Sequence, residues 1–407
     1  MTQAVVSYRS VPRILQLFNA QTPLNLSWIP HFSSVINWSL RLGLGLLKQV
    51  KPIVQPWLAI VDHSIDVGTK KALVVLRITL DRLSQKEGAL ALSDCECIGL
   101  RVSETVNGDT IAAELGEIFS QAGSPLGIIK DCDATLNKGV RLWSQSHAPE
   151  LEVIDDVGHV MATALKKQYE SSDAFKQFTT LVSGAAKKLR QTAQAFLVPP
   201  KLRSKGRFLS ISRLGEWGKK MLDVLSGEKT AQEDTILLKL SAALPEFEQT
   251  RPFVEEFANT THIVSEAMKV LKNKGLESDS YTRCQALSAQ LPNDTEVKRS
   301  LDSWLDKHIE IQRRLGAKAL PVSSDIIESL FGCFKHVIER SPQADMNRSA
   351  LIIPAFCGEL NAAKVSDALG AARHVDLDAW EAKSIPYTMR KKRHAFFRNI
   401  KLKSGEN

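Results

Sequence analysis

Two apolar runs that each end in an aspartate constrain the fold of this chain more than any other feature. The first, WLAIVD, spans residues 57–62 and is followed by a polar turn that ends at Gly68. The second, PLGIIKD, spans residues 125–131. Short apolar runs bounded by turn residues are typical of buried strands. We therefore expect two strands of one sheet, with Asp62 and Asp131 at their ends.

The segments around these runs predict the rest of the sheet. We expect strands over Ala72–Leu80, within Gly88–Val102 and over Glu152–Asp155, a helix over about Gly108–Gln121, and a helix that contains His159. Three successive strands followed by helix, strand, helix and strand make a mixed five-stranded α/β sheet. This is the order of a ribonuclease-H-like domain. In this order the first and fourth strands are neighbours, so Asp62 and Asp131 meet at one sheet edge.

The remainder of the chain is predicted to be helical. Residues 160–320 place apolar side chains at helical spacing, as at Ile236, Leu240 and Leu244, and residues 325–340 form a strongly amphipathic helix. The predicted organisation is a helical unit over residues 1–50, a first part of the sheet domain over 56–170, an all-α insertion over 171–320, a second part over 321–370 and a basic tail over 371–407.

The N-terminal helical unit has two interpretations. Helices are expected over Arg9–Phe18 and Ser33–Leu47, with Ser33 or Ser34 as the N-cap of the second. A short helix, a tight connection and a second helix with Trp38 and Arg41 are compatible with a helix-turn-helix DNA reader. A helical arm that only packs against the rest of the chain is equally compatible.

The charge distribution favours a polyanionic partner. The 407-residue chain has a net charge of +8, and its basic residues gather in three runs, over 187–190, 201–207 and 390–403. One such run is usually a solvated face. Three runs with interleaved phenylalanines indicate nucleic acid, because phosphates bind cations and bases stack on rings. The basic side chains that we predict to contact DNA in these runs are Arg203, Lys205, Arg207, Lys391 and Arg393.

Other composition features exclude several classes of protein. The six cysteines include no C-x-x-C pair, which favours free thiols in a reducing cytosol over disulfides or zinc. No apolar run reaches the roughly 18 residues that a membrane span needs. The N-terminus lacks the charged head and apolar body of a secretory signal. We therefore expect a cytoplasmic protein.

The two strand-end aspartates predict a metal site. Two adjacent carboxylates raise each other's pKa, and Mg²⁺ removes the conflict because carboxylate oxygens are its preferred protein ligands. A third carboxylate from a helix that crosses the sheet would complete a two-metal site, with ions about 3.5–4 Å apart. Glu328, on the amphipathic helix after the insertion, is the candidate.

Each of these carboxylates also has a purely structural interpretation. Asp62 or Asp131 alone is typical of a residue that caps a turn, and Asp66 and Asp133 compete for the same roles. Glu328 follows Asp325 by three residues, as the N3 member of a capping box does.

The chain resembles bacterial DDE transposases of insertion sequences over most of its length. VDHSIDVG resembles their first-aspartate strand, IIKDCDATLNKGVRLW the second, and SSDIIESLFGCFK the helix that carries the glutamate. A helical insertion before the glutamate is common in those families. Asp156-x-x-His159 fits the C/D-x-x-H element that several of them place after the second aspartate, although His159 is more typical of a hydrogen-bonded structural histidine.

The resemblance implies a reaction and its participants. Asp62, Asp131 and Glu328 would hold two Mg²⁺ ions, for which Mn²⁺ can substitute. Water would attack a phosphodiester at the transposon end, and the liberated 3′-hydroxyl would attack target DNA, within a homodimer bound to DNA. The alternatives are a catalytically inactive DNA-binding protein derived from a transposase and a related structure-specific nuclease.

Lys335 lies seven residues after Glu328 and is a further candidate for a phosphate contact. One large transposase group has a Glu-x6-Lys pair preceded by Tyr and Arg on the same helix. Pro321 and Ser324 occupy those positions here, so the chain departs from that group. A solvent-facing lysine is the alternative.

Overall fold

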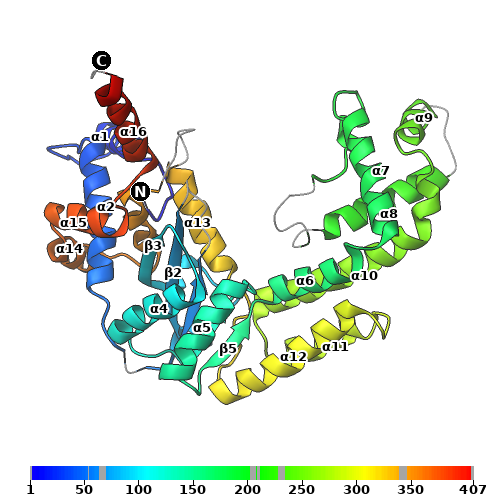
Figure 1. Cartoon of the computed structure of the whole chain (residues 1–407), viewed down its shortest axis with the longest axis horizontal. Helices are drawn as coiled ribbons and strands as arrows, with labels where there is room; N and C mark the ends of the chain where they lie inside the picture. The colour runs from blue at the N-terminus through cyan, green and yellow to red at the C-terminus, as the bar shows by residue number, and fades with distance from the viewer. Residues whose placement is uncertain are drawn as a thin grey trace. The chain divides into compact units, whose positions relative to one another are not determined.

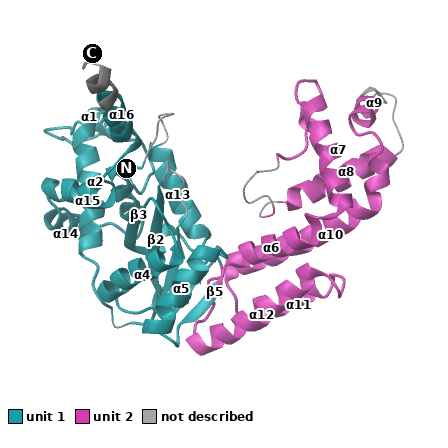
Figure 2. Cartoon of the chain, viewed as in Figure 1, with its two compact units in different colours: residues 1–154, 323–407 teal, residues 155–322 magenta. Residues whose placement is uncertain are grey.

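The computed structural model describes residues 2–53, 55–63, 70–201, 208, 211–227, 234–338 and 346–404, without the side chains of 234–235 and 399–404. The chain divides into two compact units (Figure 2). Unit 1 contains Met1–Ile154 and Ser323–Asn407, and unit 2 contains Asp155–Val322. Unit 2 thus begins at Asp155, whereas the insertion was expected from residue 171, because the helix over Val157–Tyr169 already belongs to unit 2.

Unit 1 is built on a mixed five-stranded sheet (Figure 1). Its strands are β1 (Trp57–Asp62), β2 (Lys71–Thr79), β3 (Glu96–Ser103), β4 (Gly127–Lys130) and β5 (Glu152–Asp155). The spatial order is β3-β2-β1-β4-β5. β2 runs antiparallel to both β1 and β3, whereas β4 runs parallel to β1. The predicted α/β, ribonuclease-H-like fold is confirmed, and β1 and β4 are neighbours as expected.

One face of the sheet is covered by α4 (Gly108–Ala122) and α5 (Ala134–His147). Trp57, Ala59 and Val61 of β1 belong to the apolar cluster on this face, together with Trp143 of α5. Side chains alternate between the two faces along a strand. Asp62 therefore points to the opposite face.

The opposite face is covered by helices from both ends of the chain. α13 (Asp325–Ile338) contacts β1, and α2 (Phe32–Lys48) contacts β3. No residue of α13 belongs to the cluster under α4 and α5. The amphipathic helix predicted to carry Glu328 thus lies on the face to which Asp62 points.

α2 packs into the core of unit 1. Leu40 and Leu44 contact Leu351, and Leu42 and Leu46 belong to a second buried cluster. Besides β3, α2 contacts the 3₁₀ helix η5 (Arg348–Phe356), α14 (Ala362–Ala371) and α15 (His374–Ser384). The N-cap of α2 is His31 in place of the predicted Ser33 or Ser34.

Two glycines allow α2 to approach its neighbours at backbone distance. A Cβ atom on Gly43 would overlap the carbonyl oxygen of Leu351, and one on Gly45 would overlap that of Ala368. Residues 1–50 are consequently not a separate unit. α1 (Ser10–Gln21) has no buried residue, whereas α2 is packed into unit 1. A helix-turn-helix DNA reader built from these two helices would therefore have to use α2 as its second helix while α2 stays packed in unit 1.

We predict that Gly43→Ala lowers the stability of unit 1 by about 1–3 kcal/mol or more, the range of overpacked cores, because a backbone carbonyl cannot move aside as a side chain can. The shift in the urea unfolding midpoint measures this effect.

The matched control is Gly370→Ala. Gly370 lies in α14, where a Cβ would meet no atom within 4 Å. Alanine is favoured over glycine inside helices by up to about 1 kcal/mol, so this variant should be at least as stable as the parent. Equal stability of the two variants would contradict the close packing at Gly43.

Unit 2 is helical. Its α-helices are α6 (Val157–Tyr169), α7 (Asp173–Leu189), α8 (Ser212–Ser226), α9 (Asp234–Ala243), α10 (Arg251–Lys274), α11 (Ser278–Ser288) and α12 (Glu296–Leu315). Aromatic rings of α7 and α10 pack together, with Phe175 and Phe178 against Phe253 and Phe257. The expected all-α character of the insertion is observed in its described residues.

The remaining short elements are α3 (Leu80–Gln85), η1 (Leu92–Asp94), η2 (Ala195–Leu197), η4 (Phe247–Thr250) and the basic C-terminal helix α16 (Met389–Ser404). All six cysteines, which lie in the described part of the chain, are free thiols, as predicted. Across the described residues, no helix has both the length and the apolar character needed to cross a membrane.

Candidate functional site

The register between β1 and β4 aligns the two predicted aspartates. Leu58 pairs with Gly127, and the pairing continues to Val61 and Lys130. One further step along both strands brings Asp62 opposite Asp131. Neighbouring strands are about 4.8 Å apart, so the two residues are adjacent at the same end of the sheet.

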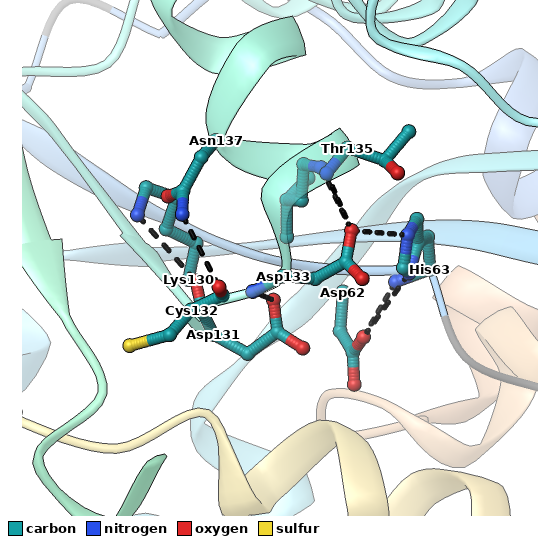
Figure 3. Close-up of polar contacts among 9 residues, drawn as sticks. Asp62, His63, Lys130, Asp131, Cys132, Asp133, Thr135 and Asn137 are labelled. Carbon is teal, nitrogen blue, oxygen red and sulfur yellow. Dashed lines mark hydrogen bonds and ion pairs between the residues drawn. The ribbon is translucent and has the colours of Figure 1, made fainter. Parts of the chain in front are cut away.

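Backbone N–H groups orient both carboxylates (Figure 3). The backbone N–H of His63 donates to Asp62 Oδ1 at 2.6 Å, and that of Asp133 donates to Asp131 Oδ1 at 3.0 Å. The Asp62 residue is only 6% exposed. The site therefore begins with two adjacent carboxylates whose positions are fixed by the turns that follow each strand.

Asp133 has a different function from Asp131. It is the N-cap of α5, and its Oδ1 accepts the backbone N–H groups of Thr135 at 2.8 Å and Leu136 at 3.1 Å. Burial acts to raise the pKa of Asp133, but the hydrogen bonds from the backbone N–H groups of Leu136 and Thr135 act against it, and the pKa is lowered overall. Of the two competing aspartates, Asp131 is the one that continues the strand register, and Asp133 caps the helix. Asp66 lies outside the described residues.

We predict that Asp133→Ala destabilises the protein by about 1 kcal/mol, because α5 loses the acceptor for two N–H groups of its first turn. Asp133→Asn should cost less, since asparagine is also a favourable N-cap. Thermal unfolding of both variants tests this. If neither Asp133→Ala nor Asp133→Asn lowered the unfolding temperature, the N-cap would contribute nothing to stability.

His63 joins the site although sequence reasoning did not select it. The residue is 5% exposed, and its Nε2 lies 3.1 Å from Asp133 Oδ1. Its Nδ1 lies 3.9 Å from Asp62 Oδ1 and has no hydrogen-bond partner among the described residues. Figure 3 shows the contacts from His63 to both aspartates. The one available signal was its place directly after Asp62, which does not reveal the contact with Asp133.

Glu328 lies in the first turn of α13 and is exposed. Because α13 begins at Asp325, Asp325 is itself helical and is not the N-cap of a capping box with Glu328. Within the described ranges, no three His, Cys, Asp or Glu side chains gather closely enough to hold a metal ion. The structure thus aligns Asp62 with Asp131 and packs the helix of Glu328 on the same face, but it does not bring the three carboxylates into one cluster.

Asp156 and His159, the predicted accessory residues, both lie in unit 2. Asp156 is fully buried and is the N-cap of α6, where its Oδ1 accepts the backbone N–H of His159 at 3.1 Å. The three-residue spacing therefore corresponds to an N-cap and its N3 partner. A catalytic role for either residue stays a prediction.

The predicted DNA contacts on α2 differ in their surroundings. Trp38 is 41% exposed and packs edge-on against Trp28 with ring centroids 6.1 Å apart. The guanidinium of Arg41 donates to the carbonyl oxygens of Leu369 at 2.7 Å and Ala372 at 2.8 Å, and so binds the C-terminal end of α14. Arg41 has a structural function, and its contact with DNA stays a prediction.

The remaining basic candidates lie on α13 and α16 or outside the described residues. Lys335 is half-buried in the last turn of α13. On α16, Lys391 donates to Glu381 at 3.3 Å, and Arg393 is exposed. Arg203, Lys205 and Arg207 lie outside the described residues.

The comparisons with known proteins give matches by structure and not by sequence. No protein-family model and no curated protein matches the sequence. Among solved structures, the chain is similar to the Drosophila P element transposase strand transfer complex, with a TM-score of 0.42 and 11% sequence identity over 92% of each chain. A similarity of this size identifies neither a family nor an activity.

Proposed function

We propose that the protein is a DDE-type DNA transposase that cleaves phosphodiester bonds at transposon ends and joins the freed 3′-hydroxyl to target DNA. The observation that carries this proposal is the β1–β4 register, whose last pair, Val61 and Lys130, directly precedes Asp62 and Asp131 at one end of a ribonuclease-H-like sheet. The position of Glu328 on a helix over the same face adds to it.

The donor atoms at this edge fit Mg²⁺. Asp62 and Asp131 offer carboxylate oxygens, the ligands that Mg²⁺ prefers, and a divalent cation offsets the repulsion between two adjacent carboxylates. We propose that these residues and Glu328 hold the metal. Bound there, Mg²⁺ would supply a coordinated water of lowered pKa and positive charge against the scissile phosphate. The backbone N–H groups of His63 and Asp133 keep the two aspartates oriented.

The partner of this site would be DNA, bound by the basic segments in a homodimer in the cytoplasm. α16 carries Arg390, Lys391, Lys392, Arg393 and Arg398 on one helix. Lysine and arginine side chains bind DNA mainly by neutralising phosphates and releasing counterions. Such contacts position the duplex and give little sequence specificity.

We predict that Asp62→Ala, Asp131→Ala and Glu328→Ala each reduce Mg²⁺-dependent strand cleavage by more than about 100-fold, beyond the loss expected from a residue that only supports a metal ligand. DNA binding should be largely retained. The assay is nicking of a supercoiled plasmid that carries the DNA flanking the gene.

Asp109→Ala is the control, because Asp109 is an exposed carboxylate of α4 that pairs with Lys138 outside the site. Normal cleavage by any of the three site variants would show that the residue is misassigned. A wild-type chain that binds DNA without nicking it would indicate an inactive derivative, and cleavage at junctions regardless of end sequence would indicate a structure-specific nuclease.

We predict that Arg393→Ala weakens DNA binding about equally for all sequences and reduces the slope of log K against log salt by about 1, the effect of one lost phosphate contact. Fluorescence anisotropy over a salt series measures both quantities. Lys138→Ala, which removes a lysine already paired with Asp109, should change neither. An unchanged slope in Arg393→Ala would remove this residue from the interface.

A further inference from the structure

The hydrogen bonds of Asp133 determine which nitrogen of His63 carries a proton. Oδ1 of Asp133 already accepts two backbone N–H groups and acts only as an acceptor. His63 Nε2, at 3.1 Å from the same oxygen, must therefore donate. In the neutral imidazole, the form that binds metal ions, one nitrogen is a donor and the other an acceptor, so in this form Nδ1 of His63 presents a lone pair.

The lone pair on His63 Nδ1 faces another hydrogen-bond acceptor, a carboxylate oxygen of Asp62, and both residues are buried. Nδ1 lies 3.9 Å from Oδ1 of Asp62, an oxygen that accepts the backbone N–H of His63 itself. No described residue donates a hydrogen bond to Nδ1. Buried polar atoms without a partner are costly, and two facing acceptors repel each other. A positive charge between Nδ1 and the carboxylate would give Nδ1 a partner and remove the repulsion between the two acceptors.

The surroundings of His63 are those of a metal-binding histidine. Such histidines nearly always donate their other ring N–H to a carboxylate or carbonyl, which fixes the tautomer and the ring orientation. His63 does so to Asp133. Neighbouring ligands that lie about 2.1 Å from an octahedrally coordinated ion are about 3 Å apart, so metal binding would draw Nδ1 and Asp62 Oδ1 together from their separation of 3.9 Å.

We propose that His63 is a further metal ligand, whose Nδ1 binds the same ion as Asp62 while Asp133 holds its imidazole in place. This inference rests on the proposed metal site. An imidazole ligand gives the site a preference among metal ions that carboxylates alone do not supply. Imidazole nitrogen favours transition metals, whereas carboxylate and water suit Mg²⁺. The site should therefore bind Mn²⁺ more tightly than Mg²⁺, and His63 should account for the difference.

Pulsed electron paramagnetic resonance of the full chain loaded with Mn²⁺ alone tests the proposal. A directly bound imidazole gives a ¹⁴N modulation of the electron spin echo. We expect this signal in the wild-type chain and in His147→Ala, which removes an exposed histidine of α5. We expect its loss in His63→Ala and His63→Asn, the second of which keeps a polar side chain if the alanine variant folds poorly.

Metal titration supplies a second readout. In His63→Asn the affinity for Mn²⁺ should fall at least about tenfold and that for Mg²⁺ much less, so the ratio of the two affinities decreases. Asp133→Asn, which retains a capping acceptor, should weaken Mn²⁺ binding by about 10- to 100-fold, as expected when the group that supports a ligating histidine is changed.

The outcomes separate this inference from the proposed function. Mn²⁺ binding that requires Asp62 but shows no ¹⁴N signal in the wild-type chain would overturn the role of His63 and leave the carboxylate site intact. Mn²⁺ binding that is unchanged in Asp62→Ala would overturn the metal site itself, and with it the proposed activity. A ¹⁴N signal that persists in both His63 variants would assign the nitrogen to another residue.

Discussion

The parallel pairing of β1 with β4 is the constraint on which the candidate site depends. The whole of β1 is buried, with alternate side chains in the cluster under α4 and α5. A register shift of one residue would turn every side chain of a strand to the other face. Asp62 would then enter an apolar cluster, where an unpaired carboxylate is costly. The apolar packing of the strand therefore fixes the position of its carboxylate.

The second constraint is the closure of the opposite face by segments far apart in the sequence. α2 contacts β3 and η5, and α13 contacts β1 and η5. Gly43 and Gly45 permit backbone contact between α2 and the segment that follows α13. α2 thus helps to hold the framework that carries Glu328, which is a structural function of this helix.

The sequence was sufficient for features that depend on local pattern. Apolar runs located the strands, and the strand order predicted that Asp62 and Asp131 are neighbours. Features that depend on tertiary contacts were not accessible in this way. His63 reaches Asp133 across 70 positions of the chain, and Arg41 binds carbonyl groups more than 300 positions away. Periodicity contains no information on such pairs. His63 was therefore missed, and Arg41 was taken only as a DNA contact.

The central claim is that Asp62, Asp131 and Glu328 share one metal site. Iron(II) bound in place of Mg²⁺ reduces added hydrogen peroxide to hydroxide and a hydroxyl radical, and the radical cuts the backbone next to the ion, so the cut positions report which segments surround it. We predict cuts near residues 62, 131 and 328 that excess Mg²⁺ suppresses and that Asp62→Ala abolishes. Cuts confined to other segments, or cuts at these positions that Mg²⁺ does not suppress, would contradict the claim.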